Sequence, residues 1–167
     1  LRSLKNPEYM MVEASSIILF LHLLVGIFFT SSSSAILNQY FEIKLDAKML
    51  RTKSRPLPNN RIDKNLALLV GIIFAIIGIF YLFIYVNPLT SFISFLTVFS
   101  YVFIYTPSKT ISKWNTIIGS FPGALPPVGG WTAATNNLEL PALILFSILF
   151  CWQIPHFLSL AIVYKED

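Results

Sequence analysis

Long stretches without a charged side chain constrain this sequence more than any other feature. Four stretches that lack Asp, Glu, Lys and Arg cover residues 14–41, 65–108, 114–138 and 140–164. About 20 apolar residues in a helix cross the hydrocarbon core of a bilayer, so each stretch is long enough to span a membrane. Charged residues make up 12% of the chain, whereas a soluble domain carries about 25%. We therefore expect an all-α fold, a polytopic transmembrane helical bundle.

The second stretch is long enough for two helices, because the Asn87-Pro88 pair in its middle is a turn signal. No repeat of fixed period and no low-complexity linker divides the chain, so residues 1–167 are expected to form one membrane domain. Because the chain begins with Leu1 and ends in a charged triplet after a helix, we expect it to be part of a longer protein. The predicted transmembrane helices lie near residues 13–40, 65–86, 89–106, 115–135 and 140–164.

Basic residues gather on what would be one side of the membrane. Seven of the twelve Lys and Arg lie in the segment 42–64, two lie between the third and fourth helices, and one follows the fifth. The other side would carry only Arg2 and Lys5. The positive-inside rule places the basic segments in the cytoplasm, or in the matrix if the membrane is mitochondrial. We expect a bacterial plasma membrane, because the basic loop is short, and we expect no nucleic-acid partner.

Three side chains that bear oxygen recur at four-residue spacing where the first helix ends. They are Asn38, Glu42 and Asp46. Four residues of an α-helix turn by about 400° and rise by about 6 Å, so the three side chains form one stripe. Mg²⁺ prefers carboxylate and carbonyl oxygens and often shares the phosphate oxygens of a substrate. The stripe therefore indicates Mg²⁺ as cofactor, with all three residues as ligands; the alternative is an ordinary helix end with solvated charges.

A basic run follows this stripe directly. It contains Arg51, Lys53 and Arg55. A guanidinium group binds phosphate oxygens in bidentate fashion, and an ammonium group acts as a point charge beside them. The basic run and the stripe together predict a site for a metal-bound diphosphate, with these three residues as its diphosphate ligands.

Three stretches of the chain resemble the UbiA-type intramembrane prenyltransferases. Residues 38–58 are similar to that family's first signature, Asn-x3-Asp-x3-Asp followed by Arg-Thr-x-x-Arg-Pro-Leu, with Glu42 in place of the middle Asp. The stretches NTIIGSFPGALPPVGGW (115–131) and WQIPHFLSLAIVYKED (152–167) resemble segments of the branch called protohaem IX farnesyltransferase. The resemblance implies a nine-helix bundle, of which this chain would hold helices two to six. It also implies a second acidic signature that begins at Asp167.

The resemblance implies transfer of a farnesyl group from farnesyl diphosphate to a vinyl group of protohaem IX, which gives haem O. Asn38, Glu42, Asp46 and Asp167 would then be the catalytic residues. His156 would contact the haem, since a polar ring at membrane depth is a functional candidate, although a structural histidine is an equal alternative. The implied partners are the two substrates, the lipid bilayer, and proteins of terminal oxidase assembly or of haem A synthesis.

Two other classes of function stay open. Another UbiA-type enzyme, acting on an aromatic or quinone precursor, would share the first signature but would differ around Pro155-His156-Phe157. A membrane transporter would bind a cation on the acidic stripe. In that case the Gly- and Pro-rich segment 119–130, which we expect to break or thin the fourth helix, would line a transport path. A transporter gives no reason for the basic run at 51–55.

Overall fold

The computed structural model describes the backbone of residues 7–163 and the side chains of residues 15–163. Every regular element within this range is helical, which confirms the prediction of an all-α fold. The elements are α1 (Pro7–Phe41), α2 (Ile43–Asp46), α3 (Lys64–Tyr85), α4 (Pro88–Phe99), the π-helix η2 (Ser100–Tyr105), α5 (Thr106–Ile111), α6 (Asn115–Thr135) and α7 (Leu140–Val163).

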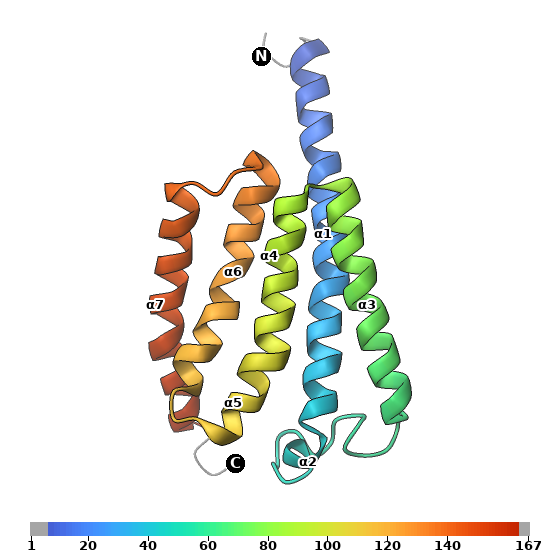
Figure 1. Cartoon of the computed structure of the whole chain (residues 1–167), viewed down its shortest axis with the longest axis vertical. Coiled ribbons are helices and arrows are strands. Elements are labelled where there is room, and N and C mark those ends of the chain that lie inside the picture. Colours follow the sequence, from blue (N-terminus) through green and yellow to red (C-terminus); the bar gives the residue numbers. More distant parts are fainter. Residues whose placement is uncertain (1–6, 164–167) are drawn as a thin grey trace.

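The long helices stand side by side in an order that differs from their order in the chain. From one edge to the other they run α7, α6, α4, α1 and α3 (Figure 1). α1, the first helix of the chain, therefore lies between α4 and α3 and not at an edge of the layer. The segment 47–63, which connects α2 to α3, lies at the same end of the layer as α5 (Figure 1). The longest polar connection of the chain thus lies at one end of an apolar bundle.

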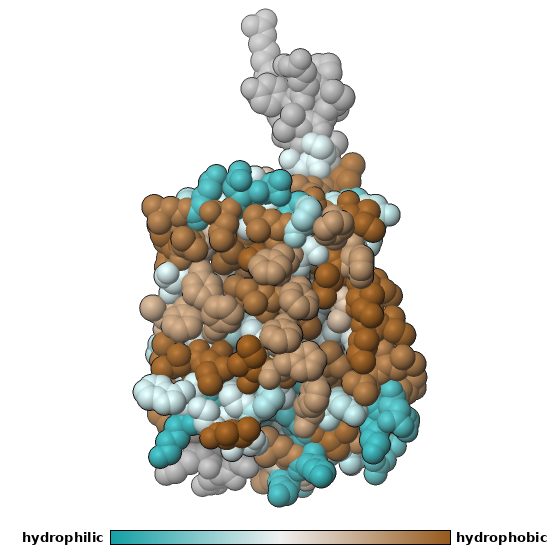
Figure 2. Space-filling model, in the orientation of Figure 1, coloured by the Kyte–Doolittle hydropathy of each residue, from teal (hydrophilic) through white to brown (hydrophobic). Residues whose placement is uncertain are grey.

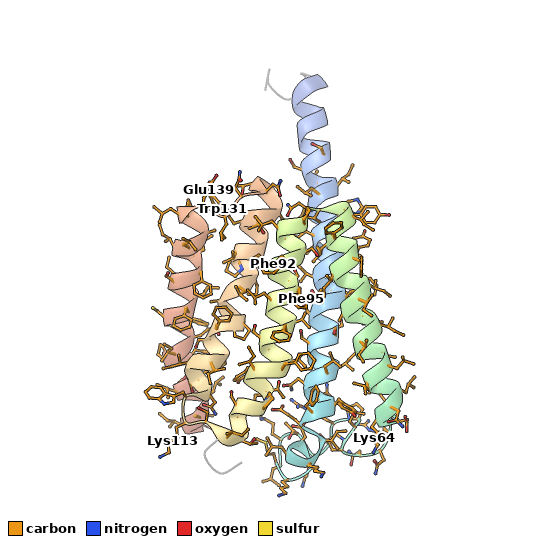
Figure 3. The ribbon with its side chains drawn as sticks, viewed as in Figure 1. Lys64, Phe92, Phe95, Lys113, Trp131 and Glu139 are labelled. Carbon is orange, nitrogen blue, oxygen red and sulfur yellow. The ribbon has the colours of Figure 1, made fainter. Side chains whose placement is uncertain are left out.

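Four helical stretches in the described part of the chain are long and apolar enough to cross a membrane. They are Ser15–Phe41, Lys64–Tyr85, Pro88–Ile111 and Leu140–Val163. On the face that Figure 2 shows, the surface is apolar over the middle of the bundle and hydrophilic toward its ends. Lys64 and Lys113 lie at one end and Glu139 at the other (Figure 3). The chain is therefore a multi-pass membrane protein, as its uncharged stretches predict.

Glycines allow α1 and α3 to approach closely. A Cβ atom added at Gly78 would lie 2.9 Å from the backbone nitrogen of Thr30, and one added at Gly71 would lie 2.7 Å from the Leu37 side chain. Ser33, which is fully buried, donates a hydrogen bond of 2.7 Å to the Gly71 carbonyl. Small residues and interhelical hydrogen bonds are what hold helices together in lipid, where the hydrophobic effect gives little help.

The turn between α3 and α4 confirms the signal at Asn87-Pro88. The Asn87 side chain accepts a hydrogen bond of 2.7 Å from the Thr90 amide and so caps α4, which begins at Pro88. The same side chain donates to the Thr132 carbonyl on α6 at 2.9 Å. The Thr90 and Thr132 hydroxyls lie 3.0 Å apart. This buried network ties the end of α6 to the start of α4.

The prediction that glycines and prolines break the fourth transmembrane helix is wrong. α6 is one continuous helix that contains Pro122, Pro126 and Pro127. Of these, Pro122 is fully buried. A proline inside a helix removes one backbone donor, but in a membrane bundle the neighbouring helices and hydroxyl side chains compensate for the loss. α6 is long enough to span a membrane, but it is less hydrophobic than the four stretches above.

Candidate active site

The stripe of Asn38, Glu42 and Asp46 runs across the break between α1 and α2. Glu42 departs from helical geometry, with φ −96° and ψ 7°. Its amide nevertheless donates to the Asn38 carbonyl at 3.0 Å, and the Asp46 amide donates to the Glu42 carbonyl at 2.8 Å. The four-residue step therefore continues through the break. All three residues are buried, with exposed fractions of 8%, 8% and 2%.

Glu42 has a cationic partner from the far end of the third membrane span. The Lys109 ammonium group lies 2.7 Å from Oε1 of Glu42 and 4.8 Å from the ring centre of Tyr105. Nδ2 of Asn38 donates to Oε2 of the same carboxylate at 2.8 Å. A buried carboxylate needs such compensation, because desolvation of an unpaired charge costs several kcal/mol.

The amide oxygen of Asn38 is also engaged. It accepts from the Thr106 hydroxyl at 3.0 Å and from the Lys109 ammonium at 3.3 Å. The Thr106 hydroxyl also lies 2.9 Å from the Tyr101 carbonyl, which already accepts from the Thr106 backbone amide at the end of η2. The π-helix thus sets Thr106 opposite Asn38. A π-turn inside a membrane helix is frequent at functional sites.

Asp46 has a cationic partner of its own, which comes from the basic run. Nη1 of Arg55 lies 2.8 Å from Oδ2 of Asp46. In the loop after α2, the Thr52 hydroxyl donates to the Asp46 carbonyl at 3.0 Å, and the Thr52 side chain is buried. The loop after α2 therefore folds back onto the stripe. Arg51 and Lys53 belong to the same loop, and both are exposed.

The structure does not bring every predicted site residue to the stripe. His156 lies on α7, which packs only against α6 among the described helices. The His156 side chain is exposed, and its ring stacks on Trp152 at 4.8 Å between ring centres. Asp167 lies outside the described residues. The catalytic role of Asp167 and the haem contact of His156 therefore stay predictions.

The ligand set of the stripe suits Mg²⁺ shared with a phosphate group. Within residues 15–163 no three His, Cys, Asp or Glu side chains cluster as a closed metal site. Glu42 and Asp46 supply two carboxylates, and Asn38 supplies one amide oxygen. Mg²⁺ is commonly held by one or two carboxylates and takes its remaining ligands from water and substrate phosphates. The stripe therefore fits an open metal site and would be too sparse for a closed one.

Sequence reasoning missed Lys109, Thr106 and Tyr105. A weak signal was present, because Tyr105 and Lys109 are four residues apart and Lys109 is the first charge after a 44-residue uncharged stretch that covers residues 65–108. A small cavity opens beside Glu42 where these residues meet the stripe. It is lined by Phe41, Glu42, Leu45, Thr106, Pro107 and Thr110.

Comparison with known proteins gives a family match over most of the chain. Residues 10–167 match the UbiA prenyltransferase family. The chain belongs to that family. UbiA prenyltransferases are membrane proteins, which is consistent with the long apolar helices of this chain. The matched residues include the stripe and its basic partners.

Two relatives that are named protoheme IX farnesyltransferase match most of this chain. The chain is 45% identical over 147 residues to a protoheme IX farnesyltransferase of Solibacter usitatus, covering 88% of this chain and 50% of that protein. It is 43% identical over 143 residues to the mitochondrial protoheme IX farnesyltransferase of Homo sapiens, covering 86% of this chain and 32% of that protein. The chain thus spans about half the length of the curated bacterial relatives it matches. No solved structure gives a significant match.

Proposed function

We propose that this chain forms the diphosphate-binding part of a protohaem IX farnesyltransferase, which transfers a farnesyl group to a vinyl group of protohaem and gives haem O. The observation that carries the proposal is a buried stripe of two carboxylates and an amide with two cations already in contact, Lys109 and Arg55. The names of the relatives favour protohaem as the acceptor over an aromatic or quinone precursor. Residues 1–167 would be one partial membrane domain of the complete enzyme.

The residues of the stripe and its loop would hold the diphosphate. Glu42, Asp46 and Asn38 would hold Mg²⁺, which, when bound, neutralises charge on the diphosphate leaving group. Lys109 and Arg55 contact the carboxylates and are therefore close enough to pair with phosphate oxygens instead. Arg51 and Lys53 would extend this basic surface, and Asp167 would begin a second acidic cluster on the other side of the diphosphate.

The reaction would proceed by ionisation. The bond between C1 of the farnesyl group and the diphosphate oxygen breaks, and its electron pair leaves with the diphosphate. A vinyl carbon of the haem attacks the allylic cation at C1. Water adds to the new cation on the haem substituent and loses a proton, which gives the hydroxyethylfarnesyl group. The apolar bundle matters here because it keeps other water away from the allylic cation.

The proposal also includes the haem contact, the membrane and the partner proteins. His156 would contact the haem, with its exposed ring available on α7. The basic loops would face the cytoplasm of a bacterium, and the membrane would be the plasma membrane. Proteins of terminal oxidase assembly or of haem A synthesis would be the partners that accept the product.

The test uses the full-length protein in membranes with protohaem, farnesyl diphosphate and Mg²⁺. We expect haem O, identified by chromatography and mass, and its loss in the Asp46→Ala variant. The matched control is Glu139→Gln, because Glu139 is an acidic residue at the opposite end of the bundle (Figure 3) and should be dispensable. Prenylation of an aromatic acid instead of haem would move the protein to the sister branch. Absence of any prenyl transfer by the folded protein would overturn the proposal.

A further inference from the structure

A cavity lies in the membrane-spanning part of the bundle and ends one helical turn from the stripe. On α1 it is lined by Leu23, Ile27, Thr30, Ser31 and Ser34. Ser34 precedes Asn38 by one helical turn, so the same face of α1 carries the cavity wall and the polar stripe. The walls from the neighbouring helices are formed by Thr90, Ile93, Ser94, Thr97 and Val98 on α4 and by Pro126 and Gly129 on α6.

Several hydroxyl groups in this wall donate to carbonyl groups of their own helices. Thr30 donates to the Gly26 carbonyl at 3.1 Å, and Ser34 donates to the Thr30 carbonyl at 3.0 Å. Thr97 on α4 donates in the same way to the Ile93 carbonyl at 2.8 Å. Because their hydrogens are used within the helix, these hydroxyls offer no donor to a bound molecule. The cavity therefore suits an apolar chain attached to the group held at the stripe.

A second cavity begins where the first one ends. Leu23 lines both cavities. The wall of the second cavity is formed by residues of α1 and by small residues of α6, and the whole lining is Ser16, Leu19, Phe20, Leu23, Gly130, Ala133 and Ala134. A Cβ atom added at Gly130 would meet no atom within 4 Å, so this space is open. Leu23 is thus a partition on α1 between two cavities that lie in series.

The length of the first cavity along α1, from Ser34 to Leu23, matches a short isoprenoid. From Ser34 to Leu23 the α1 helix rises by about 16 Å, at 1.5 Å per residue. An extended chain of three isoprene units is of similar length. A fourth unit would therefore have to displace the Leu23 side chain or leave the cavity by another way.

We propose that Leu23 closes the isoprenoid cavity and selects a three-isoprene donor over a four-isoprene donor. This inference rests on the proposed prenyl transfer and adds the residue that sets the chain length. A Leu23→Ala change would join the two cavities, and the small residues Gly130, Ala133 and Ala134 would then accommodate the additional unit. A Leu23→Phe change would shorten the cavity and favour a two-isoprene donor.

The experiment compares kcat/KM for farnesyl and geranylgeranyl diphosphates in the full-length enzyme with protohaem as acceptor. In Leu23→Ala we expect the ratio to shift at least tenfold toward geranylgeranyl diphosphate, since even one methylene in a fitted apolar pocket is worth about 10-fold or more. Leu24→Ala is the matched control, because Leu24 is the next residue on the same helix, is 45% exposed and lines neither cavity. Its ratio should equal that of the unmodified enzyme.

The outcomes separate this inference from the proposed function. If Leu23→Ala transfers farnesyl with an unchanged donor ratio, Leu23 does not set the length and the inference is overturned. If Leu23→Ala does not fold, Leu23→Phe decides through its ratio of geranyl to farnesyl transfer, which should rise if the inference holds and stay constant if it does not. If the unmodified enzyme transfers no prenyl group from any donor, the proposed function itself has failed.

Discussion

Removal of the Lys109 charge should destabilise the protein even though the residue lies at the end of a helix. Lys109 is 2.7 Å from the Glu42 carboxylate, and the two side chains are 23% and 9% exposed. Removing one partner of a buried ion pair costs about 3–5 kcal/mol, because the other charge stays buried without compensation. Since Lys109 is partly exposed and Asn38 still donates to Glu42, we expect Lys109→Met to lower the free energy of unfolding by about 3 kcal/mol.

The same reasoning predicts a rescue. In Glu42→Gln the side chain at position 42 is neutral and no longer needs a cation. Adding Lys109→Met to Glu42→Gln should therefore cost much less than adding it to the unmodified protein, with a coupling energy of about 2 kcal/mol. Lys113→Met is the control, because Lys113 is exposed and its loss should change stability by no more than about 0.5 kcal/mol.

The assay is denaturant unfolding of the full-length protein in detergent micelles, followed by circular dichroism for the four variants and the unmodified protein. It measures stability, so it does not depend on whether Lys109 also binds substrate. Equal stability of Lys109→Met and Lys113→Met would refute the claim that the pair is buried and strong. Simple additivity of Lys109→Met and Glu42→Gln would refute the claim that the two charges compensate each other.

Two further changes test other contacts. Thr106→Val removes the hydroxyl that donates to Asn38, so kcat of prenyl transfer should fall more than the affinity for the donor. Thr106→Ser keeps a hydroxyl and should restore kcat. Equal activity of the two variants and the unmodified protein would contradict the contact. Gly78→Ala would place a methyl group against the backbone of Thr30 and should destabilise the protein by about 1–3 kcal/mol, as measured by thermal unfolding in micelles. Gly130→Ala meets open space and should be neutral, and a similar loss in both glycine variants would argue against close packing at Gly78.

The spacing of the stripe could be predicted because it depends on local geometry. Asn38, Glu42 and Asp46 are joined by backbone hydrogen bonds over four-residue steps, so sequence distance translates directly into position. The contact of Arg55 with Asp46 could have been predicted for a similar reason, since the two residues are only nine positions apart. Four of the five predicted membrane spans also followed from uncharged length, whereas α6 lacks the hydropathy of the other four.

Long-range pairing set the limit of the sequence analysis. Lys109 reaches Asn38 across 71 positions, and nothing in the sequence says which loop will meet the end of α1. The π-helix at Ser100–Tyr105 was also hidden, because its residues are ordinary for a membrane helix. The prolines of α6 misled the prediction, since their cost depends on neighbours that the sequence does not place.

The ion pairs at the stripe mean that the site is electrically balanced before any substrate arrives. Lys109 and Arg55 already serve as internal counter-ions of Glu42 and Asp46. Mg²⁺ alone would have to displace these cations from the carboxylates and would then be repelled by their positive charge, so it should bind weakly. A diphosphate that enters together with the metal gives the displaced cations new partners. Under the proposed function, binding would be an exchange of counter-ions in which metal and diphosphate favour each other, and the two ion pairs would keep other metal ions from the carboxylates between turnovers.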